Sequence, residues 1–113
     1  MTVFHLSLNN LKNLLQDDFE KTMISYLKDA EESVRIIRHS YTRSDIDTLL
    51  SHAHMLSGLS GSIGAEHLSI LCRKIEYEYR SFKLFPYLEH IRNIEHEHNI
   101  ICDNIREFMK CDN

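Results

Sequence analysis

The stretch AHMLSGLSGSIGA, residues 53–65, combines one histidine with residues of very little bulk. The chain has only 3 glycines, and all of them lie within ten residues of His54. Glycine in a helix interior costs about 1 kcal/mol relative to alanine, so a cluster of glycines in a helical pattern needs a reason. We therefore expect another group to approach the backbone closely around His54.

Helical geometry places His54 beside its small neighbours. Successive residues are about 100° apart, so His54 lies at the margin of an apolar stripe centred near Ala53. Gly58 and Gly61 fall within about 40° of His54, and Ser57 within about 60°. Imidazole is a competent nucleophile near neutral pH, because its unperturbed pKa is about 6.5. The alternative is an ordinary surface histidine without a role.

The composition predicts a single all-helical domain, residues 1–113. The 113 residues include 42% hydrophobic residues and 1 proline, enough for a core without metal or disulfides. The formal net charge of -4 argues against nucleic acid and anionic membranes as main partners. Cys72, Cys102 and Cys111 form no CxxC pair, the first residues do not resemble a signal peptide, and no stretch suits a membrane span. We expect a cytoplasmic, soluble protein.

The apolar spacing predicts an antiparallel four-helix bundle with a short additional N-terminal helix over residues 8–15. The second helix follows Asp17 and Asp18, which suit a helix start. Ser44 and Asp47 resemble a capping box for the third helix, which ends between Gly58 and Gly64. The apolar stripes of the last two helices comprise Leu68, Leu71, Cys72, Ile75, Tyr79 and Phe82, then Tyr87, Ile91, Ile94, His98, Ile101, Ile105 and Phe108. Pro86 fits the first turn of the last helix.

The stretch from residue 54 to residue 76 resembles the histidine-containing phosphotransfer (HPt) domains of phosphorelays. Those domains read roughly His-x-Leu-Lys-Gly, then a small-residue run ending in Gly-Ala, then Leu-x-x-Leu-Cys-x-x-Leu-Glu. The matching residues here are His54, Leu56, Gly58, Gly64, Ala65, Leu68, Leu71, Cys72, Ile75 and Glu76. The resemblance covers roughly residues 7–110.

This resemblance implies that His54 accepts a phosphoryl group from a receiver aspartate and passes it to another receiver. The partners would be response-regulator receiver domains and a hybrid sensor histidine kinase, and the chain would be a monomeric carrier rather than an enzyme. It would hold no cofactor of its own, because Mg²⁺ is expected on the receiver. Ser51, Ser57, Gly58 and Gly61 would form the receiver docking surface.

One residue departs from the family pattern. Ser57 stands where the family usually has lysine, whose charge offsets the roughly -1.5 to -2 of a phosphoryl group. Arg73, Lys74 or Arg80 could supply a cation from the next helix. The departure keeps a second hypothesis open, in which the chain binds a receiver or kinase without phosphotransfer.

A third hypothesis concerns metal binding. His98 and Cys102 are four residues apart on one helix, and Glu95 lies three residues before His98, a spacing that suits a metal site. The favoured interpretation is a core histidine and a buried thiol, because His98 lies in the apolar seam. His52 and His54 point about 160° apart on their helix and cannot share one ion.

Overall fold

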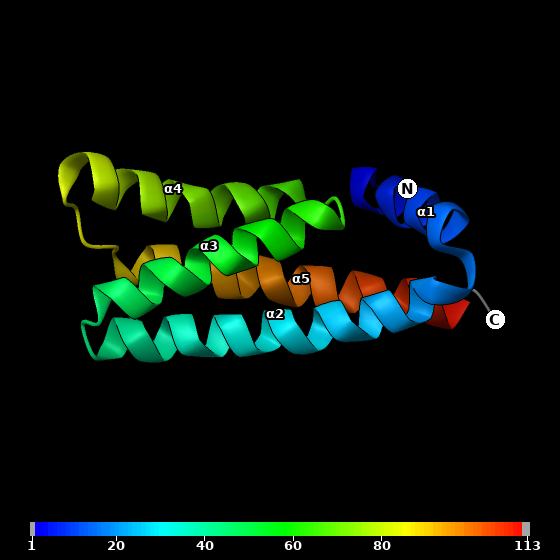
Figure 1. Cartoon of the computed structure of the whole chain (residues 1–113), viewed down its shortest axis with the longest axis horizontal. Helices are drawn as coiled ribbons and strands as arrows, with labels where there is room; N and C mark the ends of the chain where they lie inside the picture. Colours follow the sequence, from blue (N-terminus) through cyan, green and yellow to red (C-terminus); the bar gives the residue numbers. More distant parts are fainter. Residues whose placement is uncertain (1, 112–113) are drawn as a thin grey trace.

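The computed structural model describes residues 2–111, with side chains to residue 110. Its elements are α1 (Val3–Leu15), the 3-10 turn η1 (Gln16–Asp18), α2 (Phe19–Thr42), α3 (Ile46–Ser62), α4 (Glu66–Phe82) and α5 (Leu88–Cys111). Helices α2 to α5 run alternately up and down and form a bundle, with α1 at one end (Figure 1). The predicted all-α fold, a four-helix bundle with an additional N-terminal helix, is confirmed.

The core follows the predicted apolar stripes. Met23, Leu49, Leu56, Leu68 and Ile94 are fully buried, and each comes from a position where helical spacing turns an apolar side chain inward. Burying a side chain of this size contributes about 1.5–3 kcal/mol, so these stripes fix how each helix is rotated. The rotation of α3 in turn decides which residues of the 53–65 stretch reach the surface.

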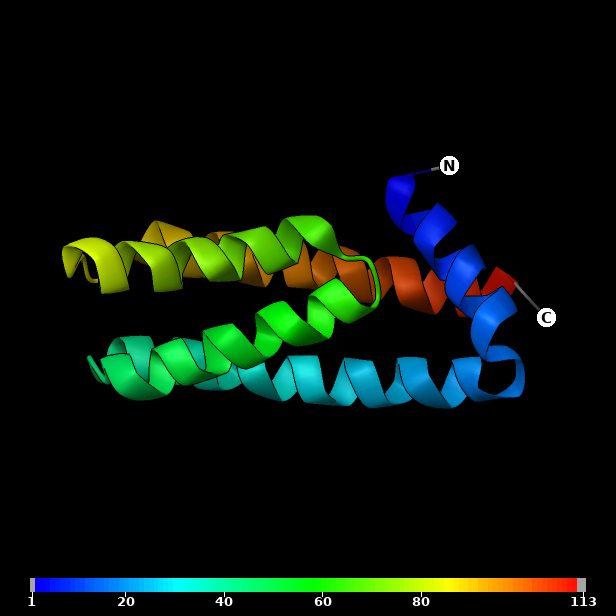
Figure 2. The same cartoon turned by 45° about the horizontal axis from the view of Figure 1, so that its top comes forward.

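The additional helix covers a part of the core that the shorter helices leave open. Helices α2 and α5 have 24 residues each, whereas α3 and α4 have 17 each. At about 1.5 Å per residue, the longer pair extends roughly 10 Å further. Helix α1 crosses this extension (Figure 2), and its Phe4 and Leu8 are buried there.

The predicted start of α2 is confirmed in position, whereas the starts predicted for α1 and α3 differ from the structure. Helix α1 begins at Val3, because the Thr2 side chain accepts a hydrogen bond from the backbone N–H of His5. Asp18 occupies the N-cap position of α2, but its side chain makes no capping hydrogen bond. The cap of α3 is Asp45, whose carboxylate accepts from the Thr48 N–H, rather than the predicted Ser44.

Three residues of the α4–α5 connection also differ from the prediction. Pro86 precedes α5 instead of lying in its first turn, since the helix begins at Leu88. Phe82 and Tyr87, assigned to apolar stripes, are exposed. Both lie near the connection between α4 and α5 at the end of the bundle. The ring of Phe82 packs on Tyr77 of α4, and the ring of Tyr87 packs on His90 of α5. The apolar spacing of one helix does not reveal where the neighbouring helices that would cover its last residues end.

Candidate functional site

His54 lies on the outside of α3, where its neighbours in sequence face the core. Ala53 and Leu56 are fully buried, and this places the ring of His54 outward, with 74% of its side chain exposed. Helix α3 begins after its N-cap residue Asp45 and ends at Ser62, and a short turn then leads to α4. His54 therefore stands near the middle of α3, on a side that adjoins α4.

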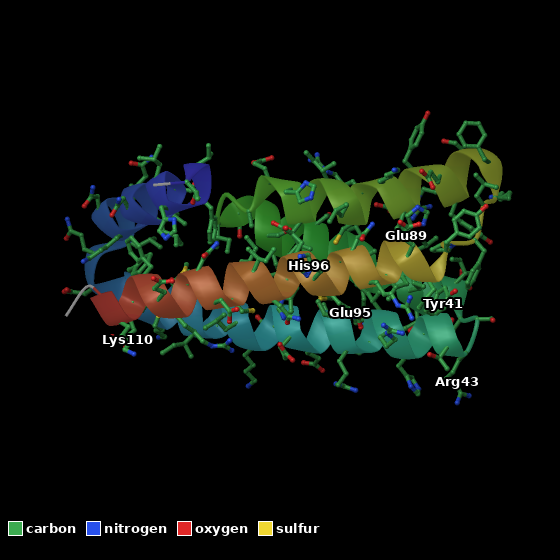
Figure 3. The ribbon with its side chains drawn as sticks, turned by 180° about the vertical axis from the view of Figure 1, so that it is seen from behind. Tyr41, Arg43, Glu89, Glu95, His96 and Lys110 are labelled. Atoms are coloured by element: carbon green, nitrogen blue, oxygen red, sulfur yellow. The ribbon has the colours of Figure 1, made fainter. Side chains whose placement is uncertain are left out.

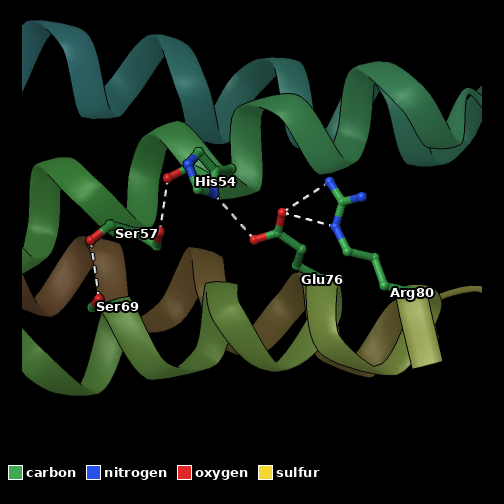
Figure 4. Close-up of polar contacts among 5 residues, drawn as sticks. All are labelled: His54, Ser57, Ser69, Glu76 and Arg80. Carbon is green, nitrogen blue, oxygen red and sulfur yellow. Dashed lines mark hydrogen bonds and ion pairs between the residues drawn. The ribbon is translucent and has the colours of Figure 1, made fainter.

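A carboxylate on α4 holds the histidine ring. Glu76 Oε1 lies 3.2 Å from His54 Nδ1, and the other oxygen of Glu76, Oε2, accepts from Arg80 Nε at 3.1 Å (Figure 4). The three side chains thus form one chain of polar contacts from α3 across to α4. Nε2 of His54 has no hydrogen-bond partner among the described residues and faces solvent.

The pKa of Glu76 shows that the ionised form is stabilised at this place. Burial raises the pKa of this carboxyl, but hydrogen bonds from His54 and Arg80 outweigh burial, so the pKa lies below its ordinary value. Glu76 is therefore a carboxylate at neutral pH. A carboxylate only accepts hydrogen bonds, so Nδ1 of a neutral His54 carries the proton and Nε2 holds the free electron pair.

His54 borders a groove between α3 and α4. The groove has a volume of about 410 Å³ and is lined by Asp47, Leu50, Ser51, His54, Glu76, Tyr79, Arg80 and Lys83. Of the cations that the sequence offered on the fourth helix, Arg80 reaches the groove, whereas Arg73 and Lys74 do not line it. Lys83, the C-cap residue that follows α4, adds a second positive charge that the sequence did not point to.

The three glycines have three different surroundings. A Cβ added at Gly58 would meet nothing within 4 Å, so this position keeps the surface beside His54 open. At Gly61 it would lie 3.5 Å from Ser69 Oγ, an ordinary contact with α4. At Gly64, where φ is +81°, it would lie 2.5 Å from Ser7 Oγ. The group that approaches the backbone closely at Gly64 is therefore the protein's own α1.

Ser57 does not share the exposed surface with Ser51, Gly58 and Gly61. Only 8% of Ser57 is exposed, and its hydroxyl donates to the backbone carbonyl of His54 at 2.7 Å. Its own carbonyl accepts from Ser69 Oγ at 3.0 Å, which ties α3 to α4 (Figure 4). The expectation that the Ser57 side chain forms part of a docking surface conflicts with this burial, because the hydroxyl is already bonded and turned inward.

The other histidines lie apart from this site. His52 faces a separate cavity, lined on the α2 side by residues that include Ser33, while His54 adjoins α4. Glu95 does not join His98, because it forms an ion pair with Arg38 of α2 and lies at the seam between α5 and α2 (Figure 3). The carboxylate beside His98 is instead Glu31, whose Oε2 lies 2.9 Å from His98 Nε2.

An exposed histidine beside an open glycine on a helical bundle agrees with the resemblance that the sequence showed to phosphotransfer domains. The family model described as Hpt domain matches residues 8–97. The chain belongs to this family, and its role is histidine phosphotransfer in a phosphorelay.

A solved structure supports the fold. The chain is similar to the crystal structure of histidine-containing phosphotransfer protein B (HptB) from Pseudomonas aeruginosa PAO1, with a TM-score of 0.81 and 24% sequence identity. The likeness covers 92% of this chain and 91% of that chain. No curated protein matches the sequence.

Membership of the family indicates the general role of the chain and the kind of partner it meets. Hpt domains are phosphocarrier modules of signalling pathways, and they interact with receiver and kinase partners of two-component systems.

None of the helices within residues 2–111 combines the length and the apolar character that a membrane crossing requires. Glu76, whose position suits the control of His54, was part of the sequence motif, but only the pairing of α3 with α4 reveals its contact.

Proposed function

We propose that His54 accepts a phosphoryl group on Nε2 from the phosphorylated aspartate of one receiver domain and passes it to the aspartate of another. The observation that carries this proposal is the contact between Glu76 and Nδ1. It leaves the exposed Nε2 as the nucleophilic atom of the ring. In the transfer, a bond forms between Nε2 and phosphorus while the bond from phosphorus to the aspartyl oxygen breaks.

Glu76 suits both directions of this transfer. Phosphorylation of Nε2 turns the ring into an imidazolium-like group that keeps its proton on Nδ1, and the adjacent carboxylate stabilises that positive charge. The aspartyl carboxylate leaves with the electron pair of the broken bond, and the reverse step returns it. No group on this chain has to take up or release a proton.

The charge of the phosphoryl group requires a cation near the ring, because the group carries about -1.5 to -2. Arg80 reaches Glu76 and lines the groove with Lys83, so both stand on the side of His54 where α4 adjoins it. We assign to Arg80 and Lys83 the role that lysine plays in the family pattern at the position of Ser57. Phosphoryl transfer depends mainly on such positioning and charge stabilisation.

The docking surface in this proposal comprises the exposed residues on both sides of the ring, Ser51, Gly58 and Gly61, together with the groove. The open space at Gly58 suits close approach of a receiver whose acidic active site must reach Nε2. Mg²⁺ would be held by that receiver, and this chain would act as a monomeric carrier in the cytoplasm, without catalytic activity of its own.

Phosphotransfer profiling tests the proposal. Each receiver domain encoded in the same genome is charged with radiolabelled acetyl phosphate and mixed with the protein. The expected result is an acid-labile label on the wild type that is absent from His54→Gln. The matched control is His52→Gln, which removes a histidine two residues away on another side of α3 and should keep the label.

Two outcomes would contradict the proposal. Label that survives in His54→Gln would place the acceptor elsewhere in the chain. Receiver binding that is equally strong in both proteins, without any transfer of label, would favour the interaction module without phosphotransfer. Circular dichroism of both variants verifies that the bundle is intact, which the exposure of His54 leads us to expect.

A further inference from the structure

We propose that Glu31, His98 and Cys102 form a binding site for a zinc-like divalent cation at the contact between α2 and α5. The three side chains each offer one donor atom, and these atoms all lie within 4.8 Å of one another. The site is separate from the His54 groove, because none of its residues lines that groove. It differs from the set that the third sequence hypothesis considered, in which Glu95 stood where Glu31 is found; the interpretation favoured from sequence was a core histidine and a buried thiol.

Two of the three donor distances are near those of a tetrahedral zinc site. With bonds of about 2.0–2.3 Å, neighbouring donor atoms of such a site lie roughly 3.4–3.6 Å apart. Cys102 Sγ lies 3.5 Å from His98 Nε2, and Glu31 Oε2 lies 2.9 Å from the same nitrogen. Cys102 Sγ also lies 3.7 Å from His98 Nδ1, which places the thiol beside the ring rather than in front of Nε2. Both the thiol and the carboxylate therefore have to turn toward an ion bound at Nε2, and the side chain of Glu31 is exposed.

The chemistry of the three ligands favours zinc over the harder cations. A thiolate and an imidazole are the ligands that select zinc among common divalent ions, whereas Mg²⁺ and Ca²⁺ prefer oxygen alone. Three protein ligands leave a fourth position for water. His98 and Cys102 lie one helical turn apart on α5 and are almost fully buried.

Access and charge also fit a cation. The side chain of Glu31 is 69% exposed, so an ion can reach His98 Nε2 from solvent past the carboxylate. On binding, the thiol proton leaves to solvent, and the proton that Nε2 of His98 shares with Glu31 is transferred through solvent to Nδ1, so that Nε2 offers its electron pair to the ion.

Cobalt is the probe, because a cysteine thiolate bound to Co²⁺ gives a charge-transfer band in the near ultraviolet. Titrating the full chain with Co²⁺ should produce this band at one equivalent, and Zn²⁺ should remove it. Cys102→Ser should lose the band. Glu31→Gln should weaken binding roughly 10–100-fold or more, the range seen when metal sites lose supporting groups.

The matched control is Glu32→Gln, which changes the neighbouring exposed carboxylate of α2 and should bind Co²⁺ as the wild type does. A second measurement guards against misfolding of Cys102→Ser: Zn²⁺ should raise the melting temperature of the wild type and of Glu32→Gln, but not of Glu31→Gln. A missing thiolate band, a band that persists in Cys102→Ser, or equal affinities of the two glutamate variants would overturn the site. In that case the contact of His98 with Glu31 is a structural hydrogen bond only.

Discussion

Glu76 controls His54 from the neighbouring helix: its Oε1 lies 3.2 Å from Nδ1 across 22 residues of sequence. The contact sets both the tautomer and the direction of the ring, since the same carboxylate is held from its other side by Arg80. The reactivity of His54 should therefore depend on α4 as much as on its own helix. The predictions that follow test this arrangement and the packing that supports it.

Removing the carboxylate should slow phosphotransfer without abolishing it. Glu76→Ala loses one hydrogen bond to His54, which is worth about 1 kcal/mol and corresponds to roughly a fivefold slower transfer. Glu76→Gln keeps an acceptor oxygen for Nδ1 and should fall between Glu76→Ala and the wild type. The initial rate of labelling from a charged receiver measures this. Equal rates in all three proteins would show that the ring needs no support.

Loss of the arginine should act through charge. Arg80→Ala removes a cation from the groove, and we expect transfer to slow by about 2–5-fold at low salt, in the range of a partly exposed ion pair. The difference should shrink at high ionic strength, because salt screens exposed charges. Lys74→Ala is the control, since this exposed cation of α4 does not line the groove. A similar loss in both variants would point to net charge rather than position.

The hydroxyl of Ser57 should matter little for the chemistry. It donates to the carbonyl of His54 and is buried, so Ser57→Ala should transfer phosphoryl groups within about twofold of the wild type. A hydrogen bond from a serine hydroxyl to a helix carbonyl contributes about 1 kcal/mol or less to stability. Labelling rates and urea unfolding separate the two effects. A large loss of transfer, with stability unchanged, would give Ser57 a direct role.

The glycines should respond to alanine in opposite directions. Gly58→Ala should raise the free energy of unfolding by about 0.5–1 kcal/mol, because the added methyl group meets open space in a helix. Gly64→Ala should lower it by more than about 1 kcal/mol, since φ is +81° and the methyl group would collide with Ser7. Urea unfolding of both variants gives the signs. Stabilisation by Gly64→Ala would contradict the packing of α1 on this turn.

The ion pair between α2 and α5 should make stability depend on pH. A hydrogen bond from Arg38 holds the pKa of Glu95 below its ordinary value of 4.5. A carboxylate with a lowered pKa stabilises the fold above its ordinary pKa and loses this contribution as the pH falls through the folded value. Glu95→Gln should therefore reduce the loss of stability between about pH 5 and pH 3 by roughly 0.5–1 kcal/mol.

The control for this pair is Glu97→Gln, a carboxylate two residues further along α5. Thermal unfolding across the acid range compares the two variants with the wild type. If Glu97→Gln flattens the pH dependence as much as Glu95→Gln does, the effect comes from net charge and not from the pair with Arg38.

The amino-acid sequence determined the helices and the side of each helix that is buried. Met23, Leu56, Leu68 and Ile94 each belong to an apolar stripe that recurs at helical spacing within its own helix. This local periodicity is enough to predict four packed helices with His54 at the edge of a stripe. The separation of His52 from His54 also follows from the geometry of one helix. Such features depend on residues within one or two turns, which sequence spacing specifies.

Only the tertiary structure decided which side chains meet between helices. Sequence spacing placed Glu95 beside His98, but the rotation of α5 against α2 gives Glu95 to Arg38 and brings Glu31 to His98. The packing of α3 against α4 likewise covers Ser57 and brings Glu76 to His54. The physical reason is that helix periodicity fixes the face of a residue on its own helix, whereas its partner depends on the relative rotation and offset of two packed helices, which follow from the packing of the whole core.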